Sequence, residues 1–488
     1  MDATERSAAA PADLAEAAVL YTYPLYEMAR MRAATSPRRT ESGAEAPAPQ
    51  RWCNTFVHAR QLLRAGGSRV VTPNHDTLYT NAWLDLGAGP LVIDVPDTAG
   101  RYYVLGLLDF YTNPFAHLGQ RLTGTRARAF VIVPPGWQGE LPAAFDASGA
   151  RIQAPTRWLW IIGRILVDGP HDVAAVNALQ DGFKLRPLAD WVAGRPPAPR
   201  AFDPACDPKA PASATHFAAQ VNAALRENPP PASELADLAR LAAVGIGPDA
   251  APLTPAQAQV LQDALDTTLP RLRQAQIGRL LPSGWNQPPL IEGHFGNDYL
   301  ARAQVALKYI GMLESREATY PIAWHDGRGR PLNGAHRYRL RFAPGALPPV
   351  DAFWSLTMYD ARDYMLVDNP IDRYAIGDRT AGLRHDADGG LTLSLQHAPP
   401  MDTAARANWL PAPHVSQSVV LAAAAVTDVV PWTALVALLS LPLPPGIVRR
   451  FQSTTVPSAL HPAVKGIARL HLVLGALYAA GIALATLS

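Results

Sequence analysis

Proline is the residue that most constrains how this chain folds, because it occurs 47 times in 488 residues. That is roughly twice the usual share of about 5%. A proline removes a backbone hydrogen-bond donor and breaks regular helices and central strands. The chain is therefore expected to fold into many short elements separated by loops, rather than into long helical bundles.

Length and charge set further limits. A chain of 488 residues is too long for one hydrophobic core, so we expect two or three domains. Charged side chains make up 17% of the residues, below the usual ~25%, which indicates either a large buried area or a part that faces a membrane. The net charge of +2 gives no reason to expect nucleic acid as a partner.

Residues 1–170 read as an N-terminal domain of helices and strands. A helix is predicted over residues 12–33, interrupted near Pro24. Short β-branched and aromatic runs follow between residues 69 and 167, bounded by Gly, Pro and Asp: PLVIDVP, RYYVLGLLDF, RAFVIVPPG and LWIIGRILV. Their short spacing predicts a β-barrel-like or sandwich arrangement instead of βαβ units.

The next two regions differ in periodicity. Residues 171–319 place apolar side chains three and four positions apart, which predicts a helical segment. Thr254 is the expected N-cap of one of its helices, with Pro255 at the first helical position. Residues 320–413 return to strands, since HRYRLRF and LTLSLQH alternate, and the bulkier DAFWSLTMYD is expected to be a central strand. The predicted fold class is α+β.

Residues 414–488 form a hydrophobic tail. Residues 419–448 hold one charged side chain, Asp428, and residues 470–488 hold none, while the segment between them carries only basic charges. This pattern predicts a helical hairpin of two membrane spans joined by a positive loop. A buried helical pair is the alternative, and the prolines of the first span would also suit a re-entrant segment.

The N-terminus contributes to the predicted location. It reads MDATERSAAAPADLAEA and lacks the basic and apolar regions of a secretory signal. We therefore expect a membrane-associated protein whose soluble domains are cytoplasmic and which contacts the membrane through residues 419–488. Two cysteines, Cys53 and Cys206, do not suggest a disulfide framework or a zinc site.

Long motifs in the strand regions resemble known families. The segments RVVTPNHDTLYTNAWLDL, VPDTAGRYYVLGLLDFYTNPFAHLGQRLTGT, VPPGWQG and APTRWLWIIGR resemble the bacterial domain of unknown function 1254. The segments YPIAWHDGRGRPLNGAHRYRLRFAPGALPPVDAFWSLTMYD, LVDNPIDRYAIGDR and NWLPAP resemble its usual companion, the domain of unknown function 1214. The resemblance covers about residues 12–413.

The resemblance implies a fold without implying a reaction. It implies helices with a β-barrel-like sheet in the first part and a jelly-roll-like β-sandwich in the second. The chain departs from the family pattern after NWLPAP, where a closing strand of the sandwich is expected and HVSQSVVLAAAAV stands instead. The tail from LPPGIVRRFQS onward is similar to the last helices of membrane quinone prenyltransferases, but it lacks their Asp-rich motifs.

The first candidate site is TPNHDTLYT, residues 72–80, which concentrates polar side chains after an apolar pair. Pro73 and Asn74 suffice to form a turn. Asp76, Thr77 and Tyr79 are then available for function, because loops on rigid sheets often carry binding residues. Asn74, Thr77 and Tyr79 are predicted to bind a ligand and Asp76 to act as a catalytic carboxylate; the alternative is that Asp76 only accepts backbone hydrogen bonds.

The second candidate cluster ends the run GRYYVLGLLDFYTNPF. Asp109 would pair with Asp76 as a second catalytic carboxylate if the two strands are neighbours, since carboxylates 5–9 Å apart support glycoside-type chemistry. In the alternative, each carboxylate holds a turn or pairs with a nearby arginine. The side chains predicted to bind ligand with it are Arg101, Tyr111, Thr112, Asn113 and Arg121, and the planar fork of Arg121 suits an anion.

The third candidate is FWSLTMYD. Strand alternation places Phe353, Ser355, Thr357 and Tyr359 on one face. Trp354 and Ser355 are predicted to bind ligand, with sheet packing as the alternative. No motif for a metal or a nucleotide is present, and Ser355 lacks the Gly-x-Ser-x-Gly context of a nucleophile. We therefore expect no metal and no cofactor.

Three functions are compatible with these patterns. The first is an enzyme or a binder of a small polar or carbohydrate-like ligand, held in a cleft between β domains. The second is a structural or interaction protein anchored in a membrane. The third treats the tail as a remnant of a prenyltransferase, a transferase. The sequence leaves open whether the protein is an enzyme and whether it forms a homo-oligomer.

Overall fold

The computed structural model describes residues 10–39, 50–67, 73–146, 149–204, 213–275, 277–289, 291–362 and 364–413. The chain separates into two compact units, of which the first comprises Met1–Leu332 and Phe342–Gly390 and the second Asn333–Arg341 and Leu391–Ser488. The described residues form eight α-helices and twenty strands, so the predicted α+β class is confirmed. The predicted division at residues 170 and 319 stays a prediction.

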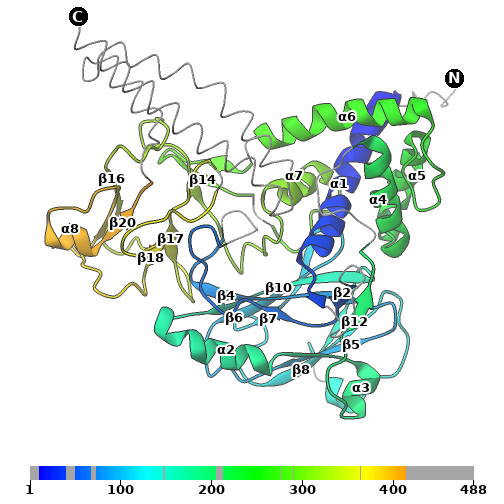
Figure 1. Ribbon diagram of the computed structural model, residues 1–488, viewed down its shortest axis with the longest axis horizontal. Coiled ribbons are helices and arrows are strands. Elements are labelled where there is room, and N and C mark those ends of the chain that lie inside the picture. Colours follow the sequence, from blue (N-terminus) through cyan, green and yellow to red (C-terminus); the bar gives the residue numbers. More distant parts are fainter. Residues whose placement is uncertain are drawn as a thin grey trace, which may run out of the picture. The chain divides into compact units, whose positions relative to one another are not determined.

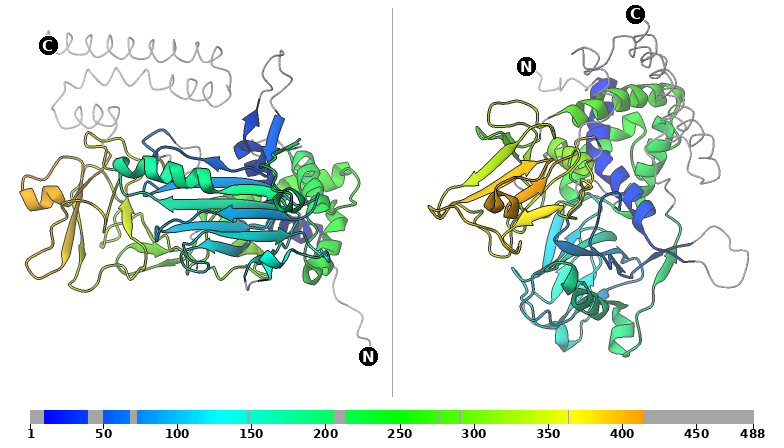
Figure 2. Two further views of the ribbon diagram at one scale, coloured as in Figure 1. Left: turned by 90° about the horizontal axis from the view of Figure 1, so that it is seen from below. Right: turned by 60° about the vertical axis from the view of Figure 1, so that its left-hand side comes forward.

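The first unit contains two sheets that pack on each other, with a layer of helices on one side (Figures 1 and 2). The five-stranded sheet has the order β3-β4-β10-β6-β7 and the four-stranded sheet the order β11-β5-β8-β9. All four runs predicted as strands are strands. Between the sheets lies a core of aliphatic and aromatic side chains that includes Leu84, Ile93, Leu105, Phe130 and Ile161. The bounds are β3 Val57–His58, β4 Thr77–Asp85, β5 Leu91–Val95, β6 Tyr103–Leu108, β7 Pro114–Gly119, β8 Arg128–Val133, β9 Arg151–Gln153, β10 Trp158–Leu166 and β11 Lys184–Pro187.

The prediction of a β-barrel-like domain is wrong for the described residues, where both sheets are open. Every residue of β6 is buried, because the five-stranded sheet is covered on both faces. A barrel strand would instead alternate between an interior and an exterior face. The continuous apolar runs therefore reflect a layered arrangement.

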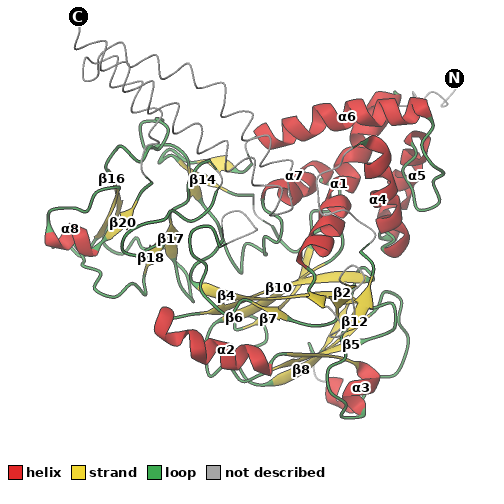
Figure 3. Ribbon diagram, in the orientation of Figure 1, coloured by secondary structure: helices red, strands yellow, loops and turns green. Residues whose placement is uncertain are grey.

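Five helices cover the other face of the five-stranded sheet (Figure 3). They pack around α1, and side chains such as Tyr26, Phe217 and Leu265 form one core with Trp83 and Trp160 of the sheet. Helix α1 contacts the other four helices, and α6 also contacts α4 and α7. Their bounds are α1 Pro11–Thr35, α4 Ala214–Glu227, α5 Leu235–Leu241, α6 Pro255–Gln274 and α7 Tyr299–Lys308.

Two expectations about helices have different outcomes. The predicted start of α6 is confirmed: Thr254 caps it in a capping box with Gln257, and Pro255 is the first helical residue. The predicted interruption of the first helix is wrong, since α1 continues through Pro24. Pro24 is buried in the middle of α1, and tertiary packing of this kind overrides the local helix-breaking preference.

The remaining elements are short. DAFWSLTMYD contributes only three residues to a two-stranded sheet, so its prediction as a central strand is wrong. In the first unit these elements are β1 Arg38–Arg39, β2 Gln50–Cys53, α2 Val173–Gly182, α3 Leu188–Val192, β12 Arg200–Phe202, β13 Arg279–Leu280, β14 Trp285–Gln287, β15 Ile322–Ala323, β17 Ser355–Thr357 and β18 Ala375–Gly377.

The second unit contains a three-stranded sheet of order β16-β19-β20 and one short helix. Its elements are β16 Tyr338–Phe342, β19 Leu391–Gln396, α8 Thr403–Ala407 and β20 Trp409–Pro411. From residue 320 to residue 413 the described strands form sheets of two or three strands, fewer than a complete jelly roll has.

The predicted membrane spans, residues 419–448 and 470–488, and the replaced closing strand after NWLPAP lie outside the described residues. Among the helices that the structure describes, none has both the length and the apolar character needed to cross a bilayer.

Candidate functional site

Strand β10 carries one cation, Arg164, in the row of otherwise apolar side chains that faces the helices. In β10 the side chains of Trp160 and Ile162 face the helices, and Arg164 follows in the same alternation. Arg164 lies opposite Tyr79 of β4 in the ladder. The strand thus places a guanidinium where its pattern leads one to expect a core residue.

Arg164 is surrounded by phenols instead of carboxylates. Its Nη1 donates to the hydroxyl of Tyr320 at 2.9 Å, and its Cζ lies 6.0 Å from the ring centroid of Tyr79 and 5.7 Å from that of Tyr320. Among the described residues, no carboxylate lies within 4.0 Å of its guanidinium. Its Nε is buried and has no described acceptor.

The two tyrosines add donors of their own. The hydroxyl of Tyr79 accepts from the backbone N–H of Asn74 at 3.2 Å, and the hydroxyl of Tyr320 accepts from Arg164. Neither phenol proton has an acceptor among the described residues. The surroundings of Arg164 therefore contain more hydrogen-bond donors than acceptors.

The segment 314–320, which ends at Tyr320, is held by a second set of polar contacts. The hydroxyl of Tyr102 donates to Glu317 Oε1 at 2.7 Å. The guanidinium of Arg121 donates to two carboxylates, with its Nε 2.6 Å from Glu317 Oε2 and its Nη2 3.0 Å from Glu314 Oε2. Arg121, which the sequence suggested for an anionic ligand, is therefore occupied by carboxylates of the protein itself.

A second arginine in a cage of tyrosines provides an internal comparison. Arg302 lies 5.1 Å from the ring of Tyr21, 5.2 Å from that of Tyr111 and 4.9 Å from that of Tyr299. This cage contains a carboxylate, Glu234, 3.4 Å from Arg302 Nη1. Both partners are buried, with side-chain exposures of 1% and 9%. Both arginines have buried nitrogens without a described acceptor, Nε of Arg164 and Nε and Nη2 of Arg302. The surroundings of Arg164 differ in lacking a described carboxylate partner.

Asp76 joins the first predicted cluster to the third. Its Oδ2 accepts from the hydroxyl of Ser355 at 2.5 Å and its Oδ1 from Arg379 Nη2 at 2.8 Å. Burial raises the pKa of the Asp76 carboxyl, and the hydrogen bond from Ser355 and the charge of Arg379 lower it less. TPNHDTLYT and FWSLTMYD, far apart in sequence, therefore meet.

The local turn chemistry supports this contact. Asn74 Oδ1 accepts from the backbone N–H of Asp76 at 2.6 Å and of Thr77 at 3.1 Å, as expected for an asparagine that bonds its own backbone. The hydroxyl of Tyr359 donates to the carbonyl of Pro73 at 2.9 Å. Ser355 and Tyr359 thus use the same strand face, as alternation predicts.

The Arg164 and Asp76 groups are neighbours. The ring of Phe353 lies 5.9 Å from that of Tyr102 and 5.0 Å from the Cζ of Arg379. Burial and then the Glu317 carboxylate raise the pKa of Tyr102, whereas the nearby Arg164 cation lowers it. We call the whole group the junction cluster; its members are Asp76, Tyr79, Tyr102, Arg164, Tyr320, Phe353, Ser355, Tyr359 and Arg379.

Asp109 does not join this cluster, and the predicted pair with Asp76 is wrong. In the ladders Thr77 lies opposite Leu166, whereas Leu108 lies opposite Trp160. Asp76 precedes β4 and Asp109 follows β6, so the two carboxylates lie at opposite ends of the sheet, more than about 20 Å apart at the usual rise per residue. That distance exceeds the 5–9.5 Å that a glycosidase pair requires.

Asp109 instead holds a turn. Its Oδ1 accepts from the backbone N–H groups of Tyr111 and Asn113 at 2.8 and 2.9 Å, and its Oδ2 accepts from Asn113 Nδ2 at 2.8 Å. Burial raises the pKa of Asp109, and these bonds lower it less. Thr112 has a positive φ of 70° inside the turn, and the Tyr111 hydroxyl donates to the carbonyl of Asn228.

The other predicted residues have partners outside the junction cluster. Arg101 pairs with Asp172 at 2.5 Å and also donates to the carbonyl of Leu166. Trp354 packs on Phe342, with ring centroids 5.3 Å apart. Thr77 donates its backbone N–H to Asn74, while its buried hydroxyl has no described partner. These contacts favour structural roles.

Sequence reasoning missed Arg164, Arg379 and Tyr320. One signal for Arg164 was present, because it is the single charged residue of the apolar run LWIIGRILV. Arg379 and Tyr320 lie in loops and reach the cluster only through the tertiary fold, so no local pattern marks them.

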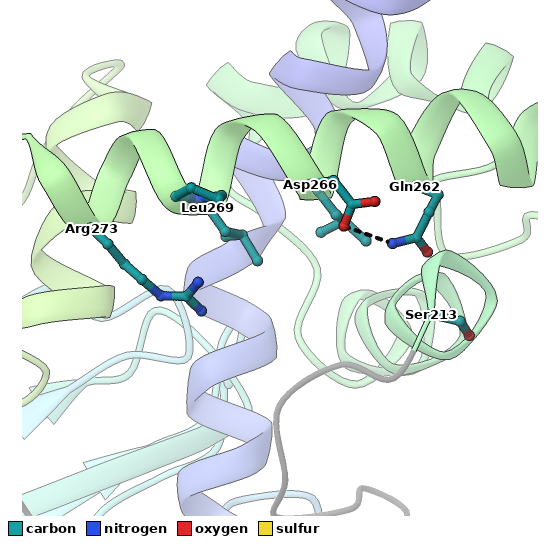
Figure 4. Close-up of a pocket in the computed structure, with 7 residues that line it drawn as sticks. Ser213, Gln262, Asp266, Leu269 and Arg273 are labelled. Carbon is teal, nitrogen blue, oxygen red and sulfur yellow. Dashed lines mark hydrogen bonds between the residues drawn. The ribbon is translucent and has the colours of Figure 1, made fainter. Parts of the chain in front are cut away.

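A pocket lies elsewhere, along α6 and the start of α4 (Figure 4). Its polar side chains serve the helices: Gln262 accepts from the backbone N–H of Ala214 and donates to Asp266 Oδ1 at 3.0 Å, and Ser213 caps α4. The pocket therefore has no polar arrangement that indicates a ligand. Its lining residues are Ser213, Gln262, Leu265, Asp266, Leu269, Pro270 and Arg273.

Comparison with protein families confirms the resemblance. Residues 53–187 match the family described as protein of unknown function DUF1254, and residues 317–423 match the family described as protein of unknown function DUF1214. The chain therefore carries these two regions in the predicted order. The junction cluster draws on both, with Asp76 and Arg164 in the first region and Tyr320, Ser355 and Arg379 in the second.

Solved structures add a fold match. The VPA0106 protein of Vibrio parahaemolyticus is 26% identical, with a TM-score of 0.59 over 83% of this chain and 92% of that chain. An uncharacterized protein from Burkholderia cenocepacia is 13% identical, with a TM-score of 0.30 over 80% of this chain and 79% of that chain, a similarity too low to support an argument. No curated protein matches, and these matches include no prenyltransferase.

Proposed function

We propose that this protein binds a small ligand bearing a carboxylate, and that Arg164 is the residue that receives it. The ligand would lie in the junction cluster, where side chains of the DUF1254 and DUF1214 regions meet. This narrows the expected small polar ligand to an anionic one. The proposal concerns recognition, and it assigns no reaction.

The missing carboxylate partner of Arg164, together with the surplus of donors around it, is the observation that carries the proposal. The Nε of Arg164 has no described acceptor, and neither do the hydroxyl protons of Tyr79 and Tyr320. A buried donor without an acceptor costs about 1–3 kcal/mol. A carboxylate is acceptor-only, offers about four lone-pair sites and matches the planar fork of arginine, so it would satisfy these donors together.

The surroundings of Arg302 provide a comparison, because there a buried arginine among tyrosines has a carboxylate partner within the protein. There the cation is compensated by Glu234 at 3.4 Å. Buried charges are ordinarily paired, because an unpaired charge is costly to bury. A ligand carboxylate would take the place at Arg164 that Glu234 takes at Arg302.

The proposal predicts that Arg164→Gln loses binding. Isothermal titration of the full chain with acetate, hexanoate and inorganic phosphate would measure affinity. Removing a charge-assisted hydrogen bond costs about 1.5–3 kcal/mol, so the dissociation constant for the preferred carboxylate is expected to rise by about 10- to 150-fold. Glutamine keeps a planar donor but removes the charge.

Arg316→Gln is the matched control, because Arg316 is an exposed arginine four residues before Tyr320. It removes the same charge near the site without touching Arg164, and its affinity should equal that of the unchanged protein. Equal affinities for Arg164→Gln and Arg316→Gln, or failure of every carboxylate, plain or hydroxylated, to bind, would show that Arg164 is not a ligand site. Tighter binding of phosphate than of either carboxylate would reject the carboxylate class.

A further inference from the structure

The polar groups of the junction cluster differ between the Arg164 side and the Asp76 side. Around Arg164 the groups are donors, whereas Asp76 and Ser355 form a carboxylate and hydroxyl pair. Asp76 uses one bond from Ser355 and one from Arg379, which leaves about half of the lone-pair sites of a carboxylate. The Nε of Arg379 is buried and has no described acceptor.

These two parts are close enough for one small molecule. Tyr79, which lies opposite Arg164, follows Asp76 by three residues, about 10 Å along an extended chain. Tyr102 and Phe353, with rings 5.9 Å apart, connect the Arg164 side to Arg379. Aromatic faces of this kind pack against the apolar faces of compact ligands.

We infer that the ligand is a hydroxylated carboxylic acid of the sugar-acid class, with about six carbons. This rests on the function proposed above. Arg164 receives the carboxylate, and the hydroxyl groups at the other end of the molecule bond to Asp76 and Ser355, each of which can still accept a hydrogen bond. A plain fatty acid offers those groups nothing, and an uncharged sugar offers nothing to Arg164.

Titration of the full chain with glucuronate, glucose and hexanoate tests this inference. Glucuronate should bind at least roughly tenfold more tightly than the other two, since each added hydrogen bond to a charged group supplies about a factor of ten or more. Ser355→Ala should weaken glucuronate binding by about three- to tenfold and Asp76→Asn by about tenfold or more. Both variants should leave hexanoate binding unchanged.

Asp168→Asn is the matched control for Asp76→Asn. Asp168 lies 3.9 Å from the other terminal nitrogen of Arg379 and is 66% exposed, so its replacement removes a carboxylate beside the same arginine. It should leave glucuronate affinity unchanged. If Asp76→Asn fails to fold, as judged by circular dichroism, Ser355→Ala decides alone, because it removes one hydroxyl and leaves the Asp76–Arg379 pair intact.

The outcomes separate this inference from the broader proposal. Equal binding of hexanoate and glucuronate, both abolished by Arg164→Gln, would reject the sugar-acid class and keep the carboxylate site. An equal loss of affinity for hexanoate and glucuronate in Ser355→Ala would also reject the sugar-acid class, because Ser355 would then not distinguish the hydroxylated acid by a hydrogen bond. Failure of both carboxylates to bind would reject the inference together with the proposed function.

Discussion

Replacing each caged arginine by methionine distinguishes a ligand-binding cation from a structural one. Methionine has a similar length but carries no charge and no donors. In Arg302→Met the partner Glu234 stays behind, with 9% of its side chain exposed. In Arg164→Met no described carboxylate is left without its partner. The same chemical change should therefore have unequal effects on stability.

The contacts of each arginine set the expected magnitudes. Breaking a buried ion pair by removing one partner costs about 3–5 kcal/mol. The expected loss for Arg302→Met is at the lower end of that range, about 3 kcal/mol, because the substitution also removes the buried Nε and Nη2, which have no described acceptor. Arg164→Met loses one hydrogen bond to Tyr320, worth about 1.5–3 kcal/mol, and two cation–π contacts near the 6 Å limit. It also removes a buried Nε without an acceptor, which relieves about 1–3 kcal/mol.

The net change for Arg164→Met is therefore expected to lie within about 1 kcal/mol of zero in the absence of ligand, because the terms of similar size oppose each other. Urea unfolding followed by tryptophan fluorescence would measure both variants, since Trp83 and Trp160 stack 5.3 Å apart in the helix-facing core. A loss of about 3 kcal/mol or more for Arg164→Met, equal to that of Arg302→Met, would refute the reasoning and make Arg164 a structural residue.

Two other predictions concern pH and the tail. Burial raises the pKa of Asp85, but bonds from Arg157 and Gly87 and the charge of Arg200 outweigh it and leave that pKa below its usual value. The stabilisation by Asp85 should be present above about pH 4 and be lost as the pH falls through the folded pKa, so acid unfolding curves should be steeper for the unchanged protein than for Asp85→Asn; equal curves would contradict this. For the tail, residues 1–413 expressed alone should remain in the soluble fraction while the full chain should need detergent, and equal partitioning in a sedimentation assay would leave no case for the predicted spans.

The parts of the fold that could be predicted are those that depend on neighbouring residues. The runs that became β5, β6, β8 and β10 are apolar and β-branched over their whole length, so their strand conformation follows from composition. Thr254, Pro255 and Gln257 start α6 through a cap that involves only four positions. Asn74 forms its turn by bonding its own backbone.

Predictions from the local conformational preferences of residues failed where tertiary packing opposed those preferences. Pro24 would break an isolated helix, yet it lies within α1, whose middle is buried in the helical layer. The same limit applies to the layered sheets, since a continuous apolar run is compatible with both a barrel and a covered open sheet. Which one forms depends on the helices that pack on the outer face.

By itself the sequence determined which polar residues stand at the ends of strands, including Asp76 and Asp109, and which face of FWSLTMYD carries Ser355 and Tyr359. Only the tertiary structure decided which of them meet. The antiparallel order of β4, β10 and β6 sends Asp76 and Asp109 to opposite ends of the sheet. The turn after β18 packs against one of these ends and brings Arg379 to Asp76 across 303 positions. Strand order and register arise from contacts between distant segments, so no local pattern encodes them.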